Sequence, residues 1–219
     1  MIIIDYTKKN HKQIIHVCVE ALKQGKALAY PTDTCYGLAV DVENIKAIEK
    51  LYKIKGRSFK KPISIIPPSV SHIKKIVKWN NTAEKLAKKF LPGALTLVLS
   101  IKHIAFRNKG IQILSARSGE LGVRWPKNSI ALDLAKYLKK PITTTSANIS
   151  GQPECYSAED LLKQFGTAKF RPDIIINSGR LPKKQPSTLI KINQDLSIQI
   201  LRSGPVLESQ IKKILKLKS

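Results

Sequence analysis

Four short segments carry polar side chains whose types and spacing could serve chemistry. The first, Tyr30–Leu38, leads from an apolar strand into a turn that holds Thr32, Asp33 and Thr34. Such a turn could offer hydroxyls and backbone N–H groups to a small polar ligand. It could equally cap its own backbone, as Asp and Thr often do in turns. The residue types alone leave both interpretations open.

The second segment, Lys55–Ser64, is rich in cations. Lys55 and Arg57 face the same way if this segment is extended, and Lys61 lies where the next strand is expected to begin. Three cations between a helix and a strand could clamp a polyphosphate, with arginine binding two oxygens at once and lysine acting as a point charge. A solvated basic loop in a lysine-rich protein is the alternative.

The other two segments place polar groups at the ends of strands. Arg124 interrupts the apolar segment Gly122–Pro126, and it needs a structural ion pair or a ligand carboxylate because burial of a lone charge is costly. The segment Pro141–Gly151 is a β-branched strand that ends in Ser146 and Asn148. Ligands commonly bind at the carboxyl ends of strands in α/β sheets, so these two side chains could contact a nucleotide. A capped turn is the alternative.

Hydrophobic periodicity predicts the elements that must position these segments. We expect helices at 10–23, 44–54, 82–90, 129–139, 157–165 and 206–217, and strands at 26–30, 63–66, 95–101, 121–125, 142–145, 173–176, 188–192 and 197–201. Strands and helices alternate at first, and strands cluster later. This order predicts an α/β fold of α+β character, in which helices flank a twisted, mixed parallel and antiparallel sheet in one domain.

Composition narrows the class of protein. The 219 residues are 42% hydrophobic and 25% charged, which excludes wholesale disorder. The formal net charge of +24 favours partners that carry phosphate, although compositional drift in the host would also produce it. Three scattered cysteines and four histidines without metal-ligand spacing support neither a disulfide framework nor a zinc site. With no leader or membrane span expected, we predict a cytoplasmic protein in a reducing compartment.

Two common nucleotide-binding motifs are absent from the sequence, the G-x-x-x-x-G-K-[ST] phosphate loop and G-x-G-x-x-G. Seven other motifs follow one another in a specific order: Y-P-T-D-T-C-Y-G-L, K-G-R-x-x-x-K-P-I-S, L-P-G-A-L-T-L-V, G-V-R-W-P, T-S-A-N-I-S-G, P-S-T-L-I and I-L-R-S-G-P. In this order they make the chain, from about residue 26 to residue 205, similar to the YrdC-like family of threonylcarbamoyl-AMP synthases.

The resemblance implies a single YrdC-like domain over residues 1–219 with a basic concave face. Its core would span about 10–205 and its C-terminal helix 206–217, without the additional C-terminal domain of longer members. The implied enzyme is a nucleotidyltransferase that converts L-threonine, bicarbonate or CO2, and ATP into threonylcarbamoyl-AMP and pyrophosphate. This is the first step of threonylcarbamoyl-adenosine modification of tRNA, so a downstream tRNA threonylcarbamoyl-transferase complex is the expected partner, and direct contact with tRNA stays open. A non-catalytic RNA-binding member of the family is the alternative function.

The resemblance also implies the roles of individual residues. The expected catalytic residues are Lys55, Arg57, Ser146 and Asn148, the threonine-binding residues are Thr34, Arg124 and Ser187, and the nucleotide-binding residues are Arg57, Lys61, Thr144, Ser146, Asn148 and Arg202. Lys55, Arg57 and Lys61 would neutralise the triphosphate. No residue is expected to bind a metal directly, and Mg²⁺ would be held through the phosphates of ATP. The chain departs from the family pattern at Glu154–Cys155, which replace Ser-Pro.

Overall fold

A computed structural model describes residues 1–216 of the protein. Its strands are β1 (Ile2–Asp5), β2 (Leu28–Tyr30), β3 (Gly37–Ala39), β4 (Ser64–Ile66), β5 (Leu95–Ser100), β6 (Glu120–Arg124), β7 (Ile142–Ser146), β8 (Ile174–Asn177), β9 (Thr188–Ile192) and β10 (Ile198–Arg202). Its helices are α1 (His11–Lys23), α2 (Ile45–Lys55), α3 (Val70–Ile76), α4 (Asn81–Phe90), α5 (His103–Phe106), α6 (Lys109–Leu114), α7 (Ser129–Leu138), α8 (Ala158–Phe165) and α9 (Glu208–Leu215).

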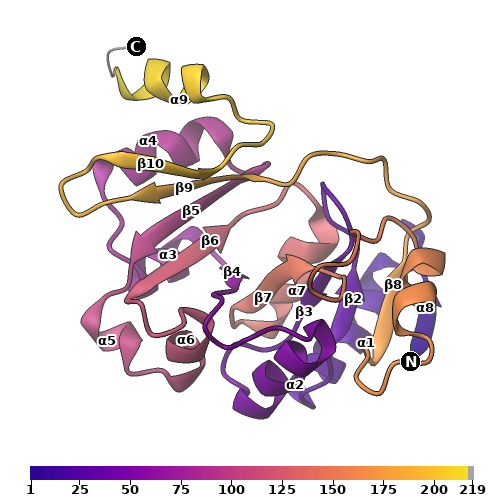
Figure 1. Ribbon diagram of the computed structural model, residues 1–219. Coiled ribbons are helices and arrows are strands. Elements are labelled where there is room, and N and C mark those ends of the chain that lie inside the picture. Colours follow the sequence, from indigo (N-terminus) through magenta and orange to yellow (C-terminus); the bar gives the residue numbers. More distant parts are fainter. Residues whose placement is uncertain (217–219) are drawn as a thin grey trace.

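The strands join into one curved sheet in the order β1-β8-β2-β3-β7-β4-β6-β5-β9-β10 (Figure 1). Its pairing is mixed: β1 and β8 are parallel, as are β5 and β9, whereas β3 and β7 are antiparallel, as are β4 and β7. An antiparallel neighbour begins where its partner ends. The middle of the sheet therefore brings the carboxyl end of β7 next to the amino end of β4.

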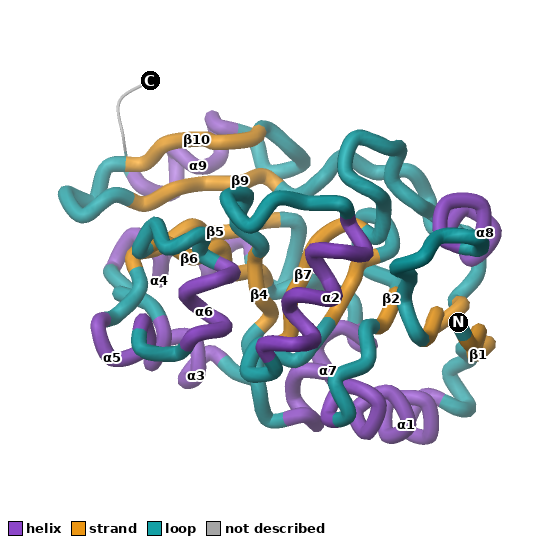
Figure 2. Tube along the Cα trace, turned by 60° about the horizontal axis from the view of Figure 1, so that its bottom comes forward, coloured by secondary structure: helices purple, strands orange, loops and turns teal. Residues whose placement is uncertain are grey.

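Apolar side chains on the two faces of the sheet form two clusters. Leu28 and Tyr30 of β2 belong to the cluster that contains α1 and α7, whereas Ala29, between them, belongs to the cluster of the opposite face. This alternation follows from the two-residue period of a strand. Helices α1 and α7 pack side by side on one face, and α2 packs with α6 on the other (Figure 2).

The mixed sheet flanked by helices confirms the predicted fold class. The basic character of its concave face stays a prediction. Five elements were not predicted: β1, β3, α3, α5 and α6. The short helices carry little hydrophobic periodicity, and β1 is an edge strand whose Ile2 is 60% exposed, so its run of isoleucines does not mark a core. Residue 217, the expected end of the C-terminal helix, lies outside the described residues.

The segment expected to be a single turn, Tyr30–Leu38, is a hairpin instead. Its end belongs to β3, which pairs antiparallel with β2 and places Tyr30 opposite Gly37. Three buried residues without polar alternation give too short a pattern for a strand to be predicted. The consequence for the site is that the loop at 31–36 is held at both ends by the sheet.

Candidate active site

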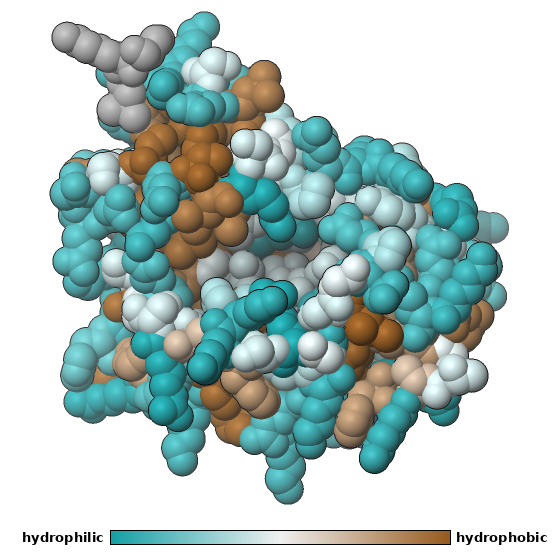
Figure 3. All heavy atoms as spheres, in the orientation of Figure 1, coloured by the Kyte–Doolittle hydropathy of each residue, from teal (hydrophilic) through white to brown (hydrophobic). Residues whose placement is uncertain are grey.

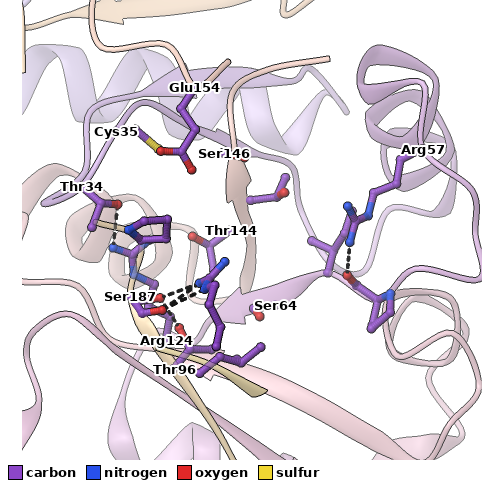
Figure 4. Close-up of a pocket in the computed structure, with 16 residues that line it drawn as sticks. Thr34, Cys35, Arg57, Ser64, Thr96, Arg124, Thr144, Ser146, Glu154 and Ser187 are labelled. Atoms are coloured by element: carbon purple, nitrogen blue, oxygen red, sulfur yellow. Dashed lines mark hydrogen bonds between the residues drawn. The ribbon is translucent and has the colours of Figure 1, made fainter. Parts of the chain in front are cut away.

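Polar side chains from several strand ends converge on a cavity of about 240 Å³, which we call the central cavity. The hollow opens on the face shown in Figure 3, and Figure 4 shows how its side chains point inward. The lining residues are Thr34, Cys35, Arg57, Pro62, Ile63, Ser64, Thr96, Arg124, Thr144, Thr145, Ser146, Glu154, Pro186, Ser187, Leu189 and Arg202. Hydroxyls and guanidiniums thus dominate the lining of this cavity.

The register of the sheet explains why these residues meet. Ser64 at the start of β4 lies opposite Thr144 near the end of β7, because the two strands are antiparallel. In the same way Thr96 at the start of β5 lies opposite Arg124 at the end of β6. These four residues stand on one face of short neighbouring strands, and together they form the polar floor of the central cavity.

Arg124 lies in one wall, held by the loop after β2. Its Nη2 forms an ion pair with the carboxylate of Asp33 and donates a hydrogen bond to Thr34 Oγ1 at 3.1 Å. The two alternatives for Arg124, a structural ion pair or a ligand contact, are not exclusive here. Its Nε is buried and has no hydrogen-bond partner among the described residues. A buried unsatisfied donor is costly, so this guanidinium is available to an acceptor on a ligand.

Ser187 and Arg202 form another wall of the central cavity. Ser187 directly precedes β9, and Arg202 is the last residue of β10. The Arg202 Nε and Nη2 atoms donate to Ser187 O at 3.0 and 2.9 Å, and the Ser187 hydroxyl lies 2.8 Å from that of Thr96. Burial, followed by the nearby charge of Arg124, lowers the pKa of the Arg202 guanidinium. Two guanidiniums that repel each other across one cavity favour an anion between them.

Lys55 does not face the central cavity with Arg57; the two side chains were expected to face the same way only if this segment were extended. The segment is not extended: Lys55 ends α2, and Gly56 adopts a left-handed conformation with φ of 54°. The Lys55 ammonium is buried under the loop after β7, where it donates to Ser146 O at 2.6 Å, Asn148 O at 2.9 Å and Asn148 Oδ1 at 3.1 Å. Its three protons are all used within the protein.

Asn148 is bound in the same network. Its Oδ1 also accepts from Ser146 Oγ at 2.6 Å, and its Nδ2 donates to Gln152 O at 2.6 Å. Lys55 and Asn148 therefore lie behind the cavity wall and fix the loop that carries Ser146. Of the three, only Ser146 lines the central cavity in the part of the chain that the structure describes.

Of the two other cations predicted for the site in this segment, Arg57 lines the central cavity and Lys61 does not. The half-buried Arg57 lines the cavity, and its Nε and Nη2 donate to the carbonyls of Lys61 and Pro62 at 3.3 and 3.1 Å. The Lys61 side chain is exposed and outside the lining set, so only its backbone contributes to the geometry. The structure thus brings together seven of the predicted residues: Thr34, Arg57, Arg124, Thr144, Ser146, Ser187 and Arg202.

Sequence reasoning missed Ser64, Thr96, Cys35 and Glu154 as lining residues. Thr96 left a signal, since it is a polar residue near the start of a mostly apolar strand. Burial raises the pKa of the Cys35 thiol to about 12, so this thiol is protonated at neutral pH and is not a nucleophile. The chemistry available to the cavity is therefore charge neutralisation and positioning rather than covalent catalysis.

Burial, followed by the charge of Arg57, lowers the pKa of the Lys55 ammonium to about 8. We therefore expect one lysine to titrate near pH 8 in a ¹³C NMR titration of the folded protein, while ordinary lysines titrate near about 10.4. Lys55→Met identifies this resonance by its loss. Because the pKa is lower in the folded protein than in the unfolded chain, the free energy of unfolding rises between about pH 8 and pH 10.5. Titration of every lysine above pH 9.5 would contradict this environment.

Residues 1–216 contain no group of three or more histidine, cysteine or acidic side chains arranged to hold a metal ion. None of the helices in the described range is both long and apolar enough to cross a membrane.

Comparison with known proteins places the chain in a family. The family model of Sua5, YciO and YrdC, described as "Telomere recombination", matches residues 20–204. A protein of Methanocaldococcus jannaschii, provisionally named a threonylcarbamoyl-AMP synthase, is 34% identical over 93% of this chain and 92% of its own length. The threonylcarbamoyl-AMP synthase of Pyrococcus abyssi is 30% identical over 98% of this chain, which spans only 61% of that protein.

Solved structures show the same relation. The structure of P. abyssi Sua5 in complex with L-threonine superposes with a TM-score of 0.87 at 30% identity, over 98% of this chain and 61% of that one. The structure of Escherichia coli YciO superposes with a TM-score of 0.77 at 25% identity, over 93% of this chain and 94% of that one. The match of the family model over most of the sequence, together with these relatives, shows that the chain belongs to the Sua5/YciO/YrdC family.

Proposed function

We propose that this protein is a threonylcarbamoyl-AMP synthase that joins L-threonine, bicarbonate and ATP and releases pyrophosphate. The observation that carries the proposal is the unpartnered buried Nε of Arg124, in a cavity that two more guanidiniums line. Such a cavity suits a ligand with a carboxylate and phosphates. Relatives that bear this activity in their names, and a neighbour with L-threonine in its structure, support the assignment.

The amino acid would bind at the Arg124 wall. The guanidinium of Arg124 is fixed by Asp33 and Thr34, so it meets the threonine carboxylate without a loss of side-chain freedom. Thr34 and Ser187 are 4% and 3% exposed, and their hydroxyls are held by neighbours. Fixed hydroxyls beside a fixed guanidinium can recognise a small hydroxy amino acid.

The nucleotide would occupy the other part of the central cavity. Arg57 and Arg202 would neutralise phosphate oxygens, and Thr144 and Ser146 would donate hydrogen bonds to the nucleotide. Lys61, whose side chain is exposed, would reach the nucleotide only by moving. Lys55 and Asn148 would act as positioning residues for Ser146 rather than as phosphate ligands.

The reaction requires little covalent chemistry from the protein. The α-ammonium of threonine first loses its proton to water, and the neutral amine then attacks the carbon of bicarbonate, which forms a carbamate and releases water. A carbamate oxygen then attacks the α-phosphorus of ATP, the bond from that phosphorus to the bridging oxygen breaks, and pyrophosphate leaves with the electron pair. Charge neutralisation by the arginines and the alignment of the two substrates are what the cavity supplies.

Mg²⁺ would enter as part of the MgATP substrate. Glu154 is the one acidic side chain among the lining residues within 1–216, too few ligands for a resident Mg²⁺ site. The product is a mixed anhydride that water can hydrolyse, so a transferase that delivers the threonylcarbamoyl group to tRNA would have to take it up promptly. We propose that the protein acts in the cytoplasm, upstream of a tRNA threonylcarbamoyl-transferase complex.

The proposal is tested by pyrophosphate release from MgATP in the presence of L-threonine and bicarbonate, with each omitted in turn. We expect release that depends on both. A non-catalytic RNA-binding protein would instead bind RNA with a steep salt dependence and turn over no ATP. Binding of ATP without any threonine-dependent release of pyrophosphate would overturn the synthase assignment.

A further inference from the structure

Glu154 introduces a negative charge into a cavity that is otherwise lined by cations and neutral groups. Within residues 1–216, it is the single carboxylate among the lining side chains, alongside three arginines. Glu154 also departs from the family pattern, because it stands where the family has serine. An acidic side chain at this position needs a reason, since it works against the binding of an anionic nucleotide.

The position of Glu154 is fixed relative to the Arg124 wall. The next residue, Cys155, accepts a hydrogen bond through its carbonyl from Tyr36 N at 2.9 Å, which ties this segment to the loop that carries Thr34. Thr34 in turn accepts from Arg124 at 3.1 Å. Figure 4 shows the Glu154 carboxylate pointing into the space that Thr34, Thr144 and Ser146 surround.

The Glu154 carboxylate is only partly satisfied by the protein. Its Oε2 accepts a hydrogen bond from the Tyr156 hydroxyl at 3.0 Å. Glu154 takes part in none of the ion pairs formed by residues 1–216. Half-buried and without a cationic partner there, it can accept hydrogen bonds from a cationic group of a ligand.

We propose that Glu154 binds the α-ammonium group of the amino-acid substrate, while Arg124 binds its carboxylate. The inference rests on the proposed function and adds the residue that recognises the second charge of the zwitterion. An ammonium is the fitting cation because a compact NH₃⁺ donates up to three hydrogen bonds to oxygens on one side of a small pocket. Mg²⁺ fits less well, since it requires near-octahedral oxygen coordination and three guanidiniums share this cavity.

Ligand pairs that differ only in the ammonium test this role. L-threonine and (R)-3-hydroxybutanoate share the carboxylate and the hydroxyl, but the second lacks the ammonium. Dissociation constants of both ligands are measured by NMR titration for the wild type, Glu154→Gln and the control Glu159→Gln. Glu159 is an exposed residue of α8 outside the cavity, so the control makes the same change of charge elsewhere.

We expect Glu154→Gln to weaken threonine binding about tenfold or more, as for the loss of one charge-assisted hydrogen bond, and to change hydroxybutanoate binding less than twofold. Glu159→Gln should leave both unchanged. An equal loss for both ligands would mean that Glu154 only shapes the cavity. An unchanged ratio with a shifted Mg²⁺ requirement would make it a metal ligand. Either result overturns the inference.

The same protein preparations test the proposed function separately. Threonine-dependent pyrophosphate release by the wild type, with an unchanged preference for threonine in Glu154→Gln, contradicts the role of Glu154 alone. A wild type that neither binds threonine nor releases pyrophosphate contradicts the synthase assignment and the role of Glu154 with it. Thermal melting of each variant confirms that losses of binding do not come from unfolding.

Discussion

Replacing Arg124 with glutamine is expected to reduce kcat/KM for threonine by on the order of 100-fold, which corresponds to about 2.7 kcal/mol. The Arg124 guanidinium can donate a hydrogen bond to a substrate carboxylate, since its Nε has no partner among the described residues. Glutamine keeps a polar side chain but loses the charge and the paired donors. Nucleotide binding should change only a few-fold, because Arg57 and Arg202 remain.

Arg124→Gln also breaks an ion pair with Asp33, so its control must break one as well. Arg180 pairs with Asp160 at 3.3 Å and lies outside the central cavity. Arg180→Gln should therefore keep full activity with threonine. If Arg124→Gln leaves the KM for threonine unchanged, or if both variants lose activity alike, Arg124 does not bind the substrate carboxylate.

Replacing Lys55 with methionine is expected to remove both activity and stability. The ammonium donates to three oxygens of the loop after β7, and methionine of similar length leaves all three without their donor. Relief from burying the charge offsets part of this loss, so we expect the free energy of unfolding to fall by about 2 kcal/mol. Product formation should fall at least about 100-fold, because Ser146 loses its fixed position.

Arg57→Gln separates catalysis from folding. Arg57 is half-buried and bonds only to the two carbonyls of Lys61 and Pro62 among the described residues. We expect Arg57→Gln to lower kcat/KM for ATP by about 100-fold, as for Lys55→Met. Its melting temperature should stay within a few degrees of the wild type. Equal melting temperatures for Lys55→Met and Arg57→Gln would contradict the positioning role of Lys55.

Much of the fold could be predicted because the long elements follow simple periods. The helices near 10–23 and 129–139 and the strand near 95–101 show clear spacing, and all three are present as α1, α7 and β5. The shortest elements could not be predicted. β3 has three fully buried residues, and α5 is a single turn without a buried face. Their conformations are set by neighbours in the sheet and not by their own patterns.

The sequence predicts which types of residue form the candidate site, but not which of their side chains are buried behind its wall. Arg124 of β6 and Ser146 of β7 both line the central cavity, although β6 is parallel to β4 and β7 is antiparallel to it, so their carboxyl ends point in opposite directions. The two side chains meet because they stand on the same face of short strands, and not because strand ends share an edge.

Lys55 is the last residue of α2, and its ammonium lies beneath Ser146 and Asn148. The left-handed turn at Gly56 redirects the chain that follows, so Arg57 does not face the same way as Lys55. Glycine permits this left-handed conformation, but a glycine in the sequence is not enough to predict it. Burial decides the role of such a lysine, and only the tertiary structure shows it.

The most direct test of the synthase assignment is a single incubation with MgATP, L-threonine and ¹³C-bicarbonate, followed by mass spectrometry. We expect an adenylate that carries the label and the threonine mass, formed in equal amount with pyrophosphate and absent when threonine is omitted. A protein that binds ATP but forms no labelled adenylate with threonine would contradict the assignment of the central cavity as a threonylcarbamoyl-AMP synthase site.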